Sequence, residues 1–328
     1  MSGSKIEAIT LGTRGSELAL FQAHHVAWVL QKHHVAVSVE IKKITTSGDR
    51  ILDAPLAKIG DKGLFVKEIE NELLAGDIDI AVHSCKDLPT EVPVGLVLSA
   101  FGRREDPRDA FIGGGRAAGA RSLADIPQGG KVGTSSLRRR SQLKSLRPDL
   151  EIVDIRGNVD TRIRKIGELG LDGTMLAAAG IRRLEREGEA SFFFAAEQMI
   201  PAVGQGVIAI EAREDDSPVR SLLECFNDEA AAAAATAERA LMRELEGGCQ
   251  VPIGAHAEAL DDKLVLNAYL GSLDGADFIR DRIKGPVTEA AELGVALAQR
   301  MYKAGGDRIL AEVREAAEGG GAAKVDHP

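Results

Sequence analysis

Cysteine and aromatic residues are scarce in this chain of 328 residues, which has three cysteines, one tryptophan, two tyrosines and nine phenylalanines. The odd, low cysteine count argues against a disulfide framework and favours a reducing compartment. No two of Cys85, Cys225 and Cys249 have the short spacing of zinc ligands, so we expect no metal site. With so few aromatic rings, the core must consist mainly of Leu, Ile, Val and Ala.

Long apolar runs and an excess of positive charge are also lacking. No stretch approaches the ~18 apolar residues needed to span a bilayer. No apolar run follows a basic start at the N-terminus, so we expect no signal peptide. The net charge is −9, whereas general nucleic-acid binding needs a basic surface. These features predict a cytoplasmic globular protein that binds neither membranes nor nucleic acids.

Strand-like and helix-like segments alternate through the first two thirds of the chain. Short apolar segments separated by helical ones predict strands at 8–12, 35–46, 78–82, 131–133, 151–155 and 175–179. This alternation is typical of open α/β sheets, and its restart after residue 103 indicates two such domains. Segment 206–212 is again strand-like, and we expect it to return to the first domain.

The last third has a different pattern. Asn227 or Asp228 is a candidate N-cap of a long helix that includes six consecutive alanines at 230–235. Strands at 263–272 and 278–285 and a helix at 288–304 follow, which predicts an α+β domain. The predicted domains are 1–102 with the return segment 207–224, then 103–206, then 225–328.

Two segments place hydroxyl groups and arginine between a strand and a helix. Thr13-Arg14-Gly15-Ser16 follows the first strand, and Thr134-Ser135-Ser136-Leu137-Arg138-Arg139 follows the strand at 131–133. Ligands of open α/β sheets lie at such strand ends, and helix N-termini favour anions. The stretch 131–165 also has ten Lys or Arg against four Asp or Glu. Anion binding is one interpretation, and a solvated basic surface is the other.

Arginine is the usual clamp for carboxylates because its planar group donates two parallel hydrogen bonds. Several arginines fall at or just after predicted strand ends, namely Arg14, Arg138, Arg139, Arg156 and Arg162. So many arginines suit a ligand with several carboxylates. The alternative is that half of them form surface ion pairs of little energetic value.

Two further positions carry reactive groups. Lys86 and Asp87 follow the strand at 78–82, where Lys86 could bind an anion and Asp87 could stabilise a cation or move a proton. The alternative there is a loop ion pair without a role. Cys249 lies in a Gly-rich turn, where its thiol could form a stable thioether with a carbon electrophile. A small buried side chain and a nucleophilic pair with His256 are the alternatives.

Together these segments resemble the hydroxymethylbilane synthase (porphobilinogen deaminase) family over residues 6–313. The motifs that carry the resemblance occur in the family's order: T-R-G-S-E-L-A from Thr13, P-L-A-K-I-G-D-K-G-L-F-V-K-E from Pro55, A-V-H-S-C-K-D-L-P from Ala81, R-E-D-P-R-D-A-F from Arg104, V-G-T-S-S-L-R-R from Val132, R-G-N-V-D-T-R from Arg156, P-A-V-G-Q-G from Pro201, and A-E-R-A-L-M-R-E-L-E-G-G-C-Q-V-P-I-G from Ala237.

The resemblance implies two domains like the halves of a type II periplasmic binding protein, with the active site between them, and a smaller α+β domain. It also implies the reaction. A dipyrromethane made from substrate is held by a thioether to Cys249, and four porphobilinogen molecules add to it with loss of ammonia. Water then releases hydroxymethylbilane from a monomeric enzyme.

The resemblance finally implies a role for each matching residue. Asp87 is expected to stabilise the cations of the reaction and to move protons. Lys86, Ser136, Arg138, Arg139 and Arg162 are expected to hold the carboxylates of the cofactor, whereas Arg14, Ser16 and Arg156 hold the incoming substrate, and Lys58, Lys62 and Phe65 cover the cleft. The rival hypothesis is a bilobal small-anion-binding protein without catalysis, which would need neither Cys249 nor Asp87.

Overall fold

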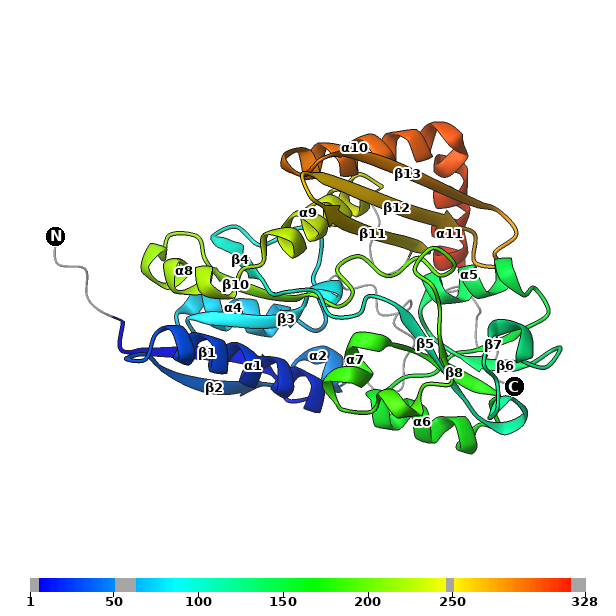
Figure 1. Ribbon diagram of the computed structural model, residues 1–328, viewed down its shortest axis with the longest axis horizontal. Coiled ribbons are helices and arrows are strands. Elements are labelled where there is room, and N and C mark those ends of the chain that lie inside the picture. The colour runs from blue at the N-terminus through cyan, green and yellow to red at the C-terminus, as the bar shows by residue number, and fades with distance from the viewer. Residues whose placement is uncertain (1–5, 51–62, 246–250, 320–328) are drawn as a thin grey trace, which may run out of the picture.

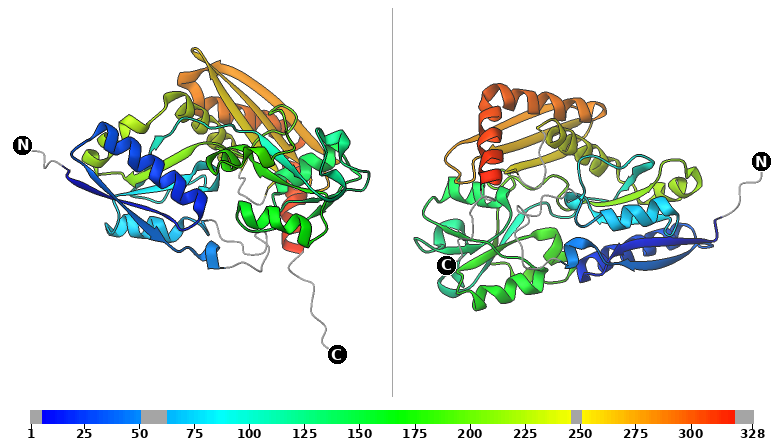
Figure 2. Two further views of the ribbon diagram at one scale, coloured as in Figure 1. Left: turned by 60° about the horizontal axis from the view of Figure 1, so that its bottom comes forward. Right: turned by 180° about the vertical axis from the view of Figure 1, so that it is seen from behind.

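The computed structural model describes residues 6–50, 63–245 and 251–319. These residues form three sheets, each the centre of one lobe (Figures 1 and 2). Their strands are β1 (Ala8–Arg14), β2 (Ser38–Ile44), β3 (Ile80–Ser84), β4 (Leu96–Phe101), β5 (Asp109–Gly113), β6 (Lys131–Gly133), β7 (Glu151–Val153), β8 (Gly173–Ala177), β9 (Phe192–Phe193), β10 (Ile208–Arg213), β11 (Ile253–Leu260), β12 (Lys263–Gly271) and β13 (Phe278–Pro286).

The sheet of the first domain has the strand order β2-β1-β3-β10-β4. Strand β1 pairs in parallel with β2 and β3, whereas β10 pairs antiparallel with β3 and β4. The strand-like segment at 206–212 therefore does return to the first sheet. Helices α1 (Glu17–His33), α2 (Ser47–Arg50), α4 (Lys67–Ala75) and α8 (Ser217–Leu223) belong to this part of the chain. Its core includes Leu11, Val26, Ile80 and Ile210, all fully buried.

The second domain repeats this arrangement with the order β7-β6-β8-β5-β9. Here β6 pairs in parallel with β7 and β8, and β5 is the antiparallel strand. Its helices are α5 (Leu137–Leu146), α6 (Val159–Glu168) and α7 (Ala178–Arg183). The predicted α/β fold class with two such domains is confirmed, and the exact domain limits stay a prediction.

The third domain is an antiparallel sheet, β11-β12-β13, covered on one face by α9 (Glu229–Glu244) and α10 (Ala290–Met301) (Figure 1). Asp228 is the N-cap of α9, and its side chain accepts a hydrogen bond from the backbone N–H of Ala231. The predicted helix at 288–304 is wrong at its end, because a π-helical turn at Tyr302–Gly306 leads into α11 (Asp307–Gly319). Strand β11 and helix α11 were not predicted.

The three domains meet at the buried carboxylate of Glu238 on α9. One oxygen accepts hydrogen bonds from Nη2 of Arg104 and from the backbone N–H of Ala257, and the other accepts from the backbone N–H of Gly204, each at 2.7 Å. Arg104 and Gly204 belong to the two chain segments that cross between the first and second domains. The third domain is therefore attached at the crossing, where the first two domains join.

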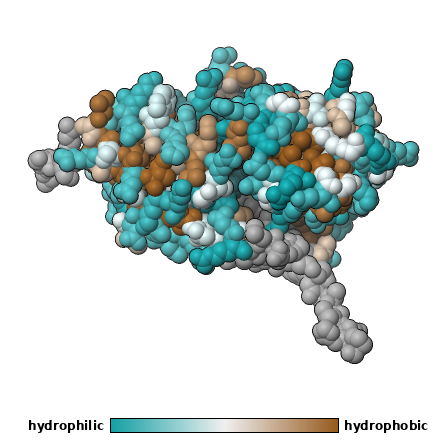
Figure 3. Space-filling model, turned by 90° about the horizontal axis from the view of Figure 1, so that it is seen from below, coloured by the Kyte–Doolittle hydropathy of each residue, from teal (hydrophilic) through white to brown (hydrophobic). Residues whose placement is uncertain are grey.

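The surface seen from below is mostly hydrophilic, with separate apolar patches (Figure 3). Over the described ranges, no helix combines the length and the apolar character that a membrane crossing requires.

Candidate active site

Strand β3 leads directly into the short 3-10 helix η1 (Cys85–Asp87). The backbone N–H of Cys85 donates to the carbonyl of Val207 at 2.9 Å, which ties this turn to the segment entering β10. His83 and Cys85 are buried, whereas Asp87 is exposed. The turn therefore presents the carboxylate of Asp87 to solvent from an anchored backbone.

Lys86 lies partly buried beside Asp87. Burial lowers the pKa of Lys86 to about 8, and the charges of Arg139 and Arg138 lower it as well, against the opposing effect of Asp87 and Asp109. The five groups come from η1, α5 and β5, which belong to different domains. Lys86 and Asp87 of the first domain therefore face charged groups of the second.

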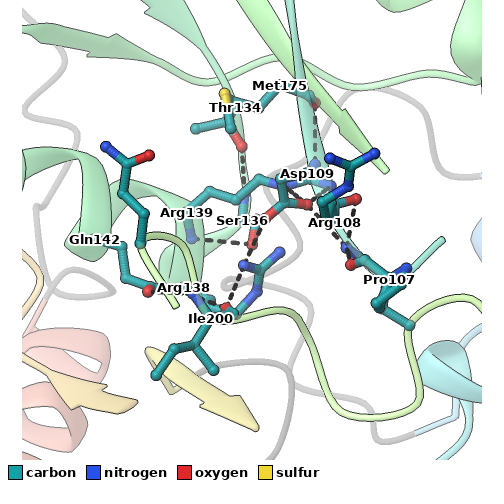
Figure 4. A network of polar contacts seen from close by, with 12 residues as sticks. Pro107, Arg108, Asp109, Thr134, Ser136, Arg138, Arg139, Gln142, Met175 and Ile200 are labelled. Atoms are coloured by element: carbon teal, nitrogen blue, oxygen red, sulfur yellow. Dashed lines mark hydrogen bonds and ion pairs between the residues drawn. The ribbon is translucent and has the colours of Figure 1, made fainter. Parts of the chain in front are cut away.

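Helix α5 begins with two buried arginines (Figure 4). Ser136 is its N-cap, and the hydroxyl accepts a hydrogen bond from the backbone N–H of Arg139 at 3.4 Å. Arg138 donates through Nη1 to the carbonyl of Ile200 at 2.8 Å, and Arg139 donates through Nη1 to the carbonyl of Met175 at 3.0 Å. Both guanidinium groups are held by backbone positions that belong to the framework of the second domain.

Both arginines also share one carboxylate, that of Asp109 at the start of β5 (Figure 4). Nη1 of Arg138 lies 2.7 Å from Oδ2, and Nη2 of Arg139 lies 2.8 Å from Oδ1. Although burial opposes ionisation of Asp109, the two arginines hold the pKa of its carboxyl well below its usual range. The sequence analysis did not single out Asp109. The available signal was an acidic residue heading the otherwise apolar strand D-A-F-I-G.

Arg156 and Arg162 flank the entry of α6. Gly157 between them has a φ of 124°, which favours glycine, and its carbonyl accepts a hydrogen bond from Nε of Arg162 at 2.8 Å. Burial lowers the pKa of Arg162 to about 10, as does the nearby charge of Arg139, while Asp87 opposes this. Arg162 thus lies within electrostatic reach of the buried Arg139 and of the exposed carboxylate of Asp87.

The corresponding turn of the first domain is built around Arg14. Its Nη2 lies 2.5 Å from Oδ1 of Asp49, and its guanidinium carbon lies 4.2 Å from the ring centroid of Phe65. Burial opposes ionisation of Asp49, yet hydrogen bonds from Arg14 and Thr46 lower the pKa of its carboxyl. Ser16 is the N-cap of α1 and accepts a hydrogen bond from the backbone N–H of Ala19 at 3.3 Å.

Charge effects link Lys86 with Asp87, Arg138 and Arg139, and they link Arg162 with Asp87 and Arg139. Arg14 instead forms a second cluster with Asp49 and Phe65. Three predicted residues, Lys58, Lys62 and Cys249, lie outside the described residues. Among the residues that are described, no group of three His, Cys, Asp or Glu side chains could hold a metal ion.

Two family models match the chain: "Porphobilinogen deaminase, dipyromethane cofactor binding domain" over residues 9–221, and "Porphobilinogen deaminase, C-terminal domain" over residues 232–303. Porphobilinogen deaminase of Geobacter sulfurreducens is 50% identical over 308 residues, which cover 94% of this chain and 95% of that protein. The enzyme of Syntrophomonas wolfei is 51% identical over 307 residues, covering 94% and 99%. The chain belongs to the porphobilinogen deaminase family, and the predicted enzyme class and dipyrromethane cofactor are confirmed.

Solved structures that align with the chain include two binding proteins. The probable amino-acid ABC transporter extracellular-binding protein ytmK of Bacillus subtilis aligns with a TM-score of 0.40 and 12% identity, covering 67% of this chain and 90% of that one. Substrate binding domain 2 of GlnP from Lactococcus lactis aligns with a TM-score of 0.41 and 10% identity, covering 74% and 92%.

Proposed function

We propose that this transferase joins four porphobilinogen molecules head to tail into hydroxymethylbilane, on a dipyrromethane held by a thioether to Cys249. The observation that carries the assignment of residues is the position of Asp87, exposed at the end of β3 and within reach of the charges of Lys86 and Arg162. Such an arrangement suits a ligand with peripheral carboxylates and a reacting centre that becomes positively charged. The nearby cations would bind the carboxylates, and Asp87 would stabilise the positive charge.

The side chains present fit a dipyrromethane with acetate and propionate groups. When bound, the dipyrromethane supplies a free pyrrole α-carbon as the nucleophile. Arg138, Arg139 and Arg162 are buried or partly buried donors on the second domain, with Ser136 at the N-terminus of α5. Lys86 adds a fourth cation from the first domain. Each desolvated cation–carboxylate hydrogen bond contributes about 1.5–3 kcal/mol.

Asp87 performs the chemistry in this proposal. Ammonia leaves the aminomethyl carbon of porphobilinogen with the electron pair of the C–N bond, and Asp87 stabilises the cation that remains. When the nucleophilic pyrrole α-carbon forms the new carbon–carbon bond, Asp87 would accept the proton that this carbon loses, or pass it to solvent. Its exposure on an anchored turn allows both tasks at successive additions.

Arg14, Ser16 and Arg156 hold the carboxylates of the incoming substrate in this proposal. The hydroxyl of Ser16 accepts one backbone hydrogen bond as the N-cap of α1 and still has its own hydrogen to donate. Phe65 packs against Arg14 and, with Lys58 and Lys62, covers the site and excludes water that would trap the cation. The enzyme is further proposed to act as a cytoplasmic monomer.

The intact mass of the denatured protein tests the central claim, with Cys249→Ala as the control. We expect a mass excess of two linked pyrrole units in the parent protein and none in the control. A bare mass that stays bare after incubation with porphobilinogen would instead favour the rival, a bilobal small-anion-binding protein. Alkylation with iodoacetamide is a second test. A thioether makes Cys249 resistant to the reagent, whereas the thiol of an enzyme that uses Cys249 and His256 would react rapidly.

A further inference from the structure

The carboxylate of Asp109 lies where an anionic ligand of two arginines would lie. Its Oδ2 accepts from Nη1 of Arg138, and its Oδ1 accepts from Nε and Nη2 of Arg139, at 2.7, 3.1 and 2.8 Å. A fourth donor, Nε2 of Gln205, reaches Oδ1 at 3.0 Å. The side chain of Asp109 is fully buried, so this carboxylate belongs to the protein's interior and touches no bulk solvent.

The charge balance explains why a carboxylate is needed there. Arg138 and Arg139 are neighbours in sequence, and both side chains are about 95% buried. Two buried guanidinium groups with no counter-charge would repel each other and lose their hydration, whereas one carboxylate leaves the group with a single net positive charge. Arg138 still keeps Nε without a hydrogen-bond partner within the described ranges, so its capacity as a donor is not exhausted.

The same network connects to the chain segment that crosses back to the first domain. Arg138 and Nε2 of Gln142 both donate to the carbonyl of Ile200, and Gln205 also donates to the carbonyl of Pro107 at 2.7 Å. These contacts leave little freedom for either guanidinium group. The arginine pair is therefore fixed by the protein before any ligand arrives.

Asp109 is also within electrostatic reach of Lys86. It raises the pKa of that amine, against the lowering by burial, Arg139 and Arg138. A change of charge at Asp109 must therefore shift the pKa of Lys86, which lies in the other domain.

We propose that Asp109 is a positioning residue, which holds Arg138 and Arg139 in one arrangement and sets the net charge of the carboxylate-binding site. Asp109 itself contacts no ligand and takes no part in the chemistry. This inference rests on the proposed function of the two arginines, and a readout at Lys86 makes it testable apart from that function.

The first test compares Asp109→Asn with Asp172→Asn. Asp172 is a second buried aspartate of the same domain that pairs with an arginine, Arg116, at 2.7 Å. Among the described residues, its carboxylate accepts hydrogen bonds from Arg116 and from the backbone N–H of Lys131, neither of which is a predicted site residue. Three quantities are measured: thermal unfolding, the rate at which the apoprotein gains the mass of the cofactor from porphobilinogen, and the titration of Lys86 by competitive labelling with acetic anhydride and mass spectrometry.

We expect Asp109→Asn to slow the gain of mass by at least about tenfold and to lower the pH at which Lys86 titrates. Asp172→Asn should change neither, although both variants unfold at lower temperature. Wild-type loading and wild-type titration of Lys86 in Asp109→Asn would overturn the proposal. Equal effects in both variants would overturn it too, because they would reduce the role of Asp109 to stability.

A double variant covers the case in which Asp109→Asn does not fold. Asp109→Asn with Arg138→Gln removes one charge of each sign, so it should fold and return the titration of Lys86 towards the parent value, while loading remains impaired. Failure of both variants to fold would overturn the proposal, because Asp109 would then act independently of charge balance. If the parent protein itself gains no mass, the proposed function fails, and the Lys86 titration still decides the role of Asp109.

Discussion

Both α/β domains place an arginine where a strand leads into a helix, but in different surroundings: Arg14 ends β1, and Arg138 lies in the first turn of α5. In the first domain, the side chains of Arg14 and its partner Asp49 are each about one quarter exposed, at 25% and 26%. In the second domain, Arg138 and Asp109 are 5% and 0% exposed. Each domain thus pairs an arginine near the start of a helix with an aspartate, and the two pairs differ in how deeply they are buried.

This difference matches the two tasks that we propose. A partly exposed arginine over the ring of Phe65 can exchange Asp49 for a carboxylate that enters from solvent at every addition. Buried arginines held by Asp109 cannot rearrange without a large cost in free energy, because breaking a buried ion pair costs several kcal/mol. The second domain therefore suits a group that stays on the enzyme, and the first suits one that arrives.

The largest expected effect is at Asp87. Asp87→Ala should lower the turnover of porphobilinogen by about 10²–10⁴-fold, because the cation of the reaction loses its carboxylate. The circular dichroism spectrum should not change, since the side chain is exposed. Asp215→Ala, at another exposed aspartate, is the control, and near-normal turnover of Asp87→Ala would contradict the mechanism.

Arg138→Leu should prevent cofactor assembly and lower the free energy of unfolding by about 3–5 kcal/mol, because Asp109 loses one of its two counter-charges. The intact mass and urea unfolding measure the two effects. Arg164→Leu removes an exposed arginine of the same domain and should affect neither. Isolation of fully loaded Arg138→Leu protein would refute the assignment.

Arg14→Met should leave cofactor loading intact and raise the KM for porphobilinogen by about 10- to 100-fold, the loss of one charge-assisted carboxylate contact. Steady-state kinetics on loaded enzyme measures the change. If loading fails instead, as expected for Arg138→Leu, the proposed division of tasks between the domains is wrong.

The smallest effect concerns Lys86, which lies in the first domain but whose charge depends on the second. Because its pKa is lowered to about 8, the amine is charged below that pH and neutral above it. Because Lys86 is proposed to hold the carboxylates of the cofactor, the rate at which the apoprotein gains the cofactor should fall by about tenfold between pH 8 and pH 9.5. Lys86→Met should load slowly without this fall, and an unchanged pH profile in that variant would assign the titration to another group.

Local features of the site could be predicted from the sequence, whereas distant partners could not. The sequence analysis placed Ser16 and Ser136 between a strand and a helix, and both are N-caps, because a cap depends only on the residues that follow it. Asp109 lies 29 residues from Arg138, and nothing in a single sequence pairs them. The expectation that Arg138 and Arg139 are free to clamp ligands thus missed the carboxylate that already engages both.

Strands and helices could likewise be predicted where the local sequence pattern was clear. The strands that alternate with helices were predicted because their apolar runs are bounded by turns. Strand β11 was missed because its small residues, such as Gly254 and Ala255, give little apolar contrast, although both are buried. Gly254 has a specific reason to be small, since a Cβ there would lie 2.8 Å from the carbonyl oxygen of Ile200.

The antiparallel strand β10 has a consequence for synthesis of the chain on the ribosome. It lies between β3 and β4, yet it follows all strands of the second sheet in sequence. The nascent chain can therefore complete the second sheet while β3 still lacks a neighbour on one side. The turn that carries Asp87 gains its hydrogen bond to Val207 only after that, so the second domain can be complete before this turn is anchored.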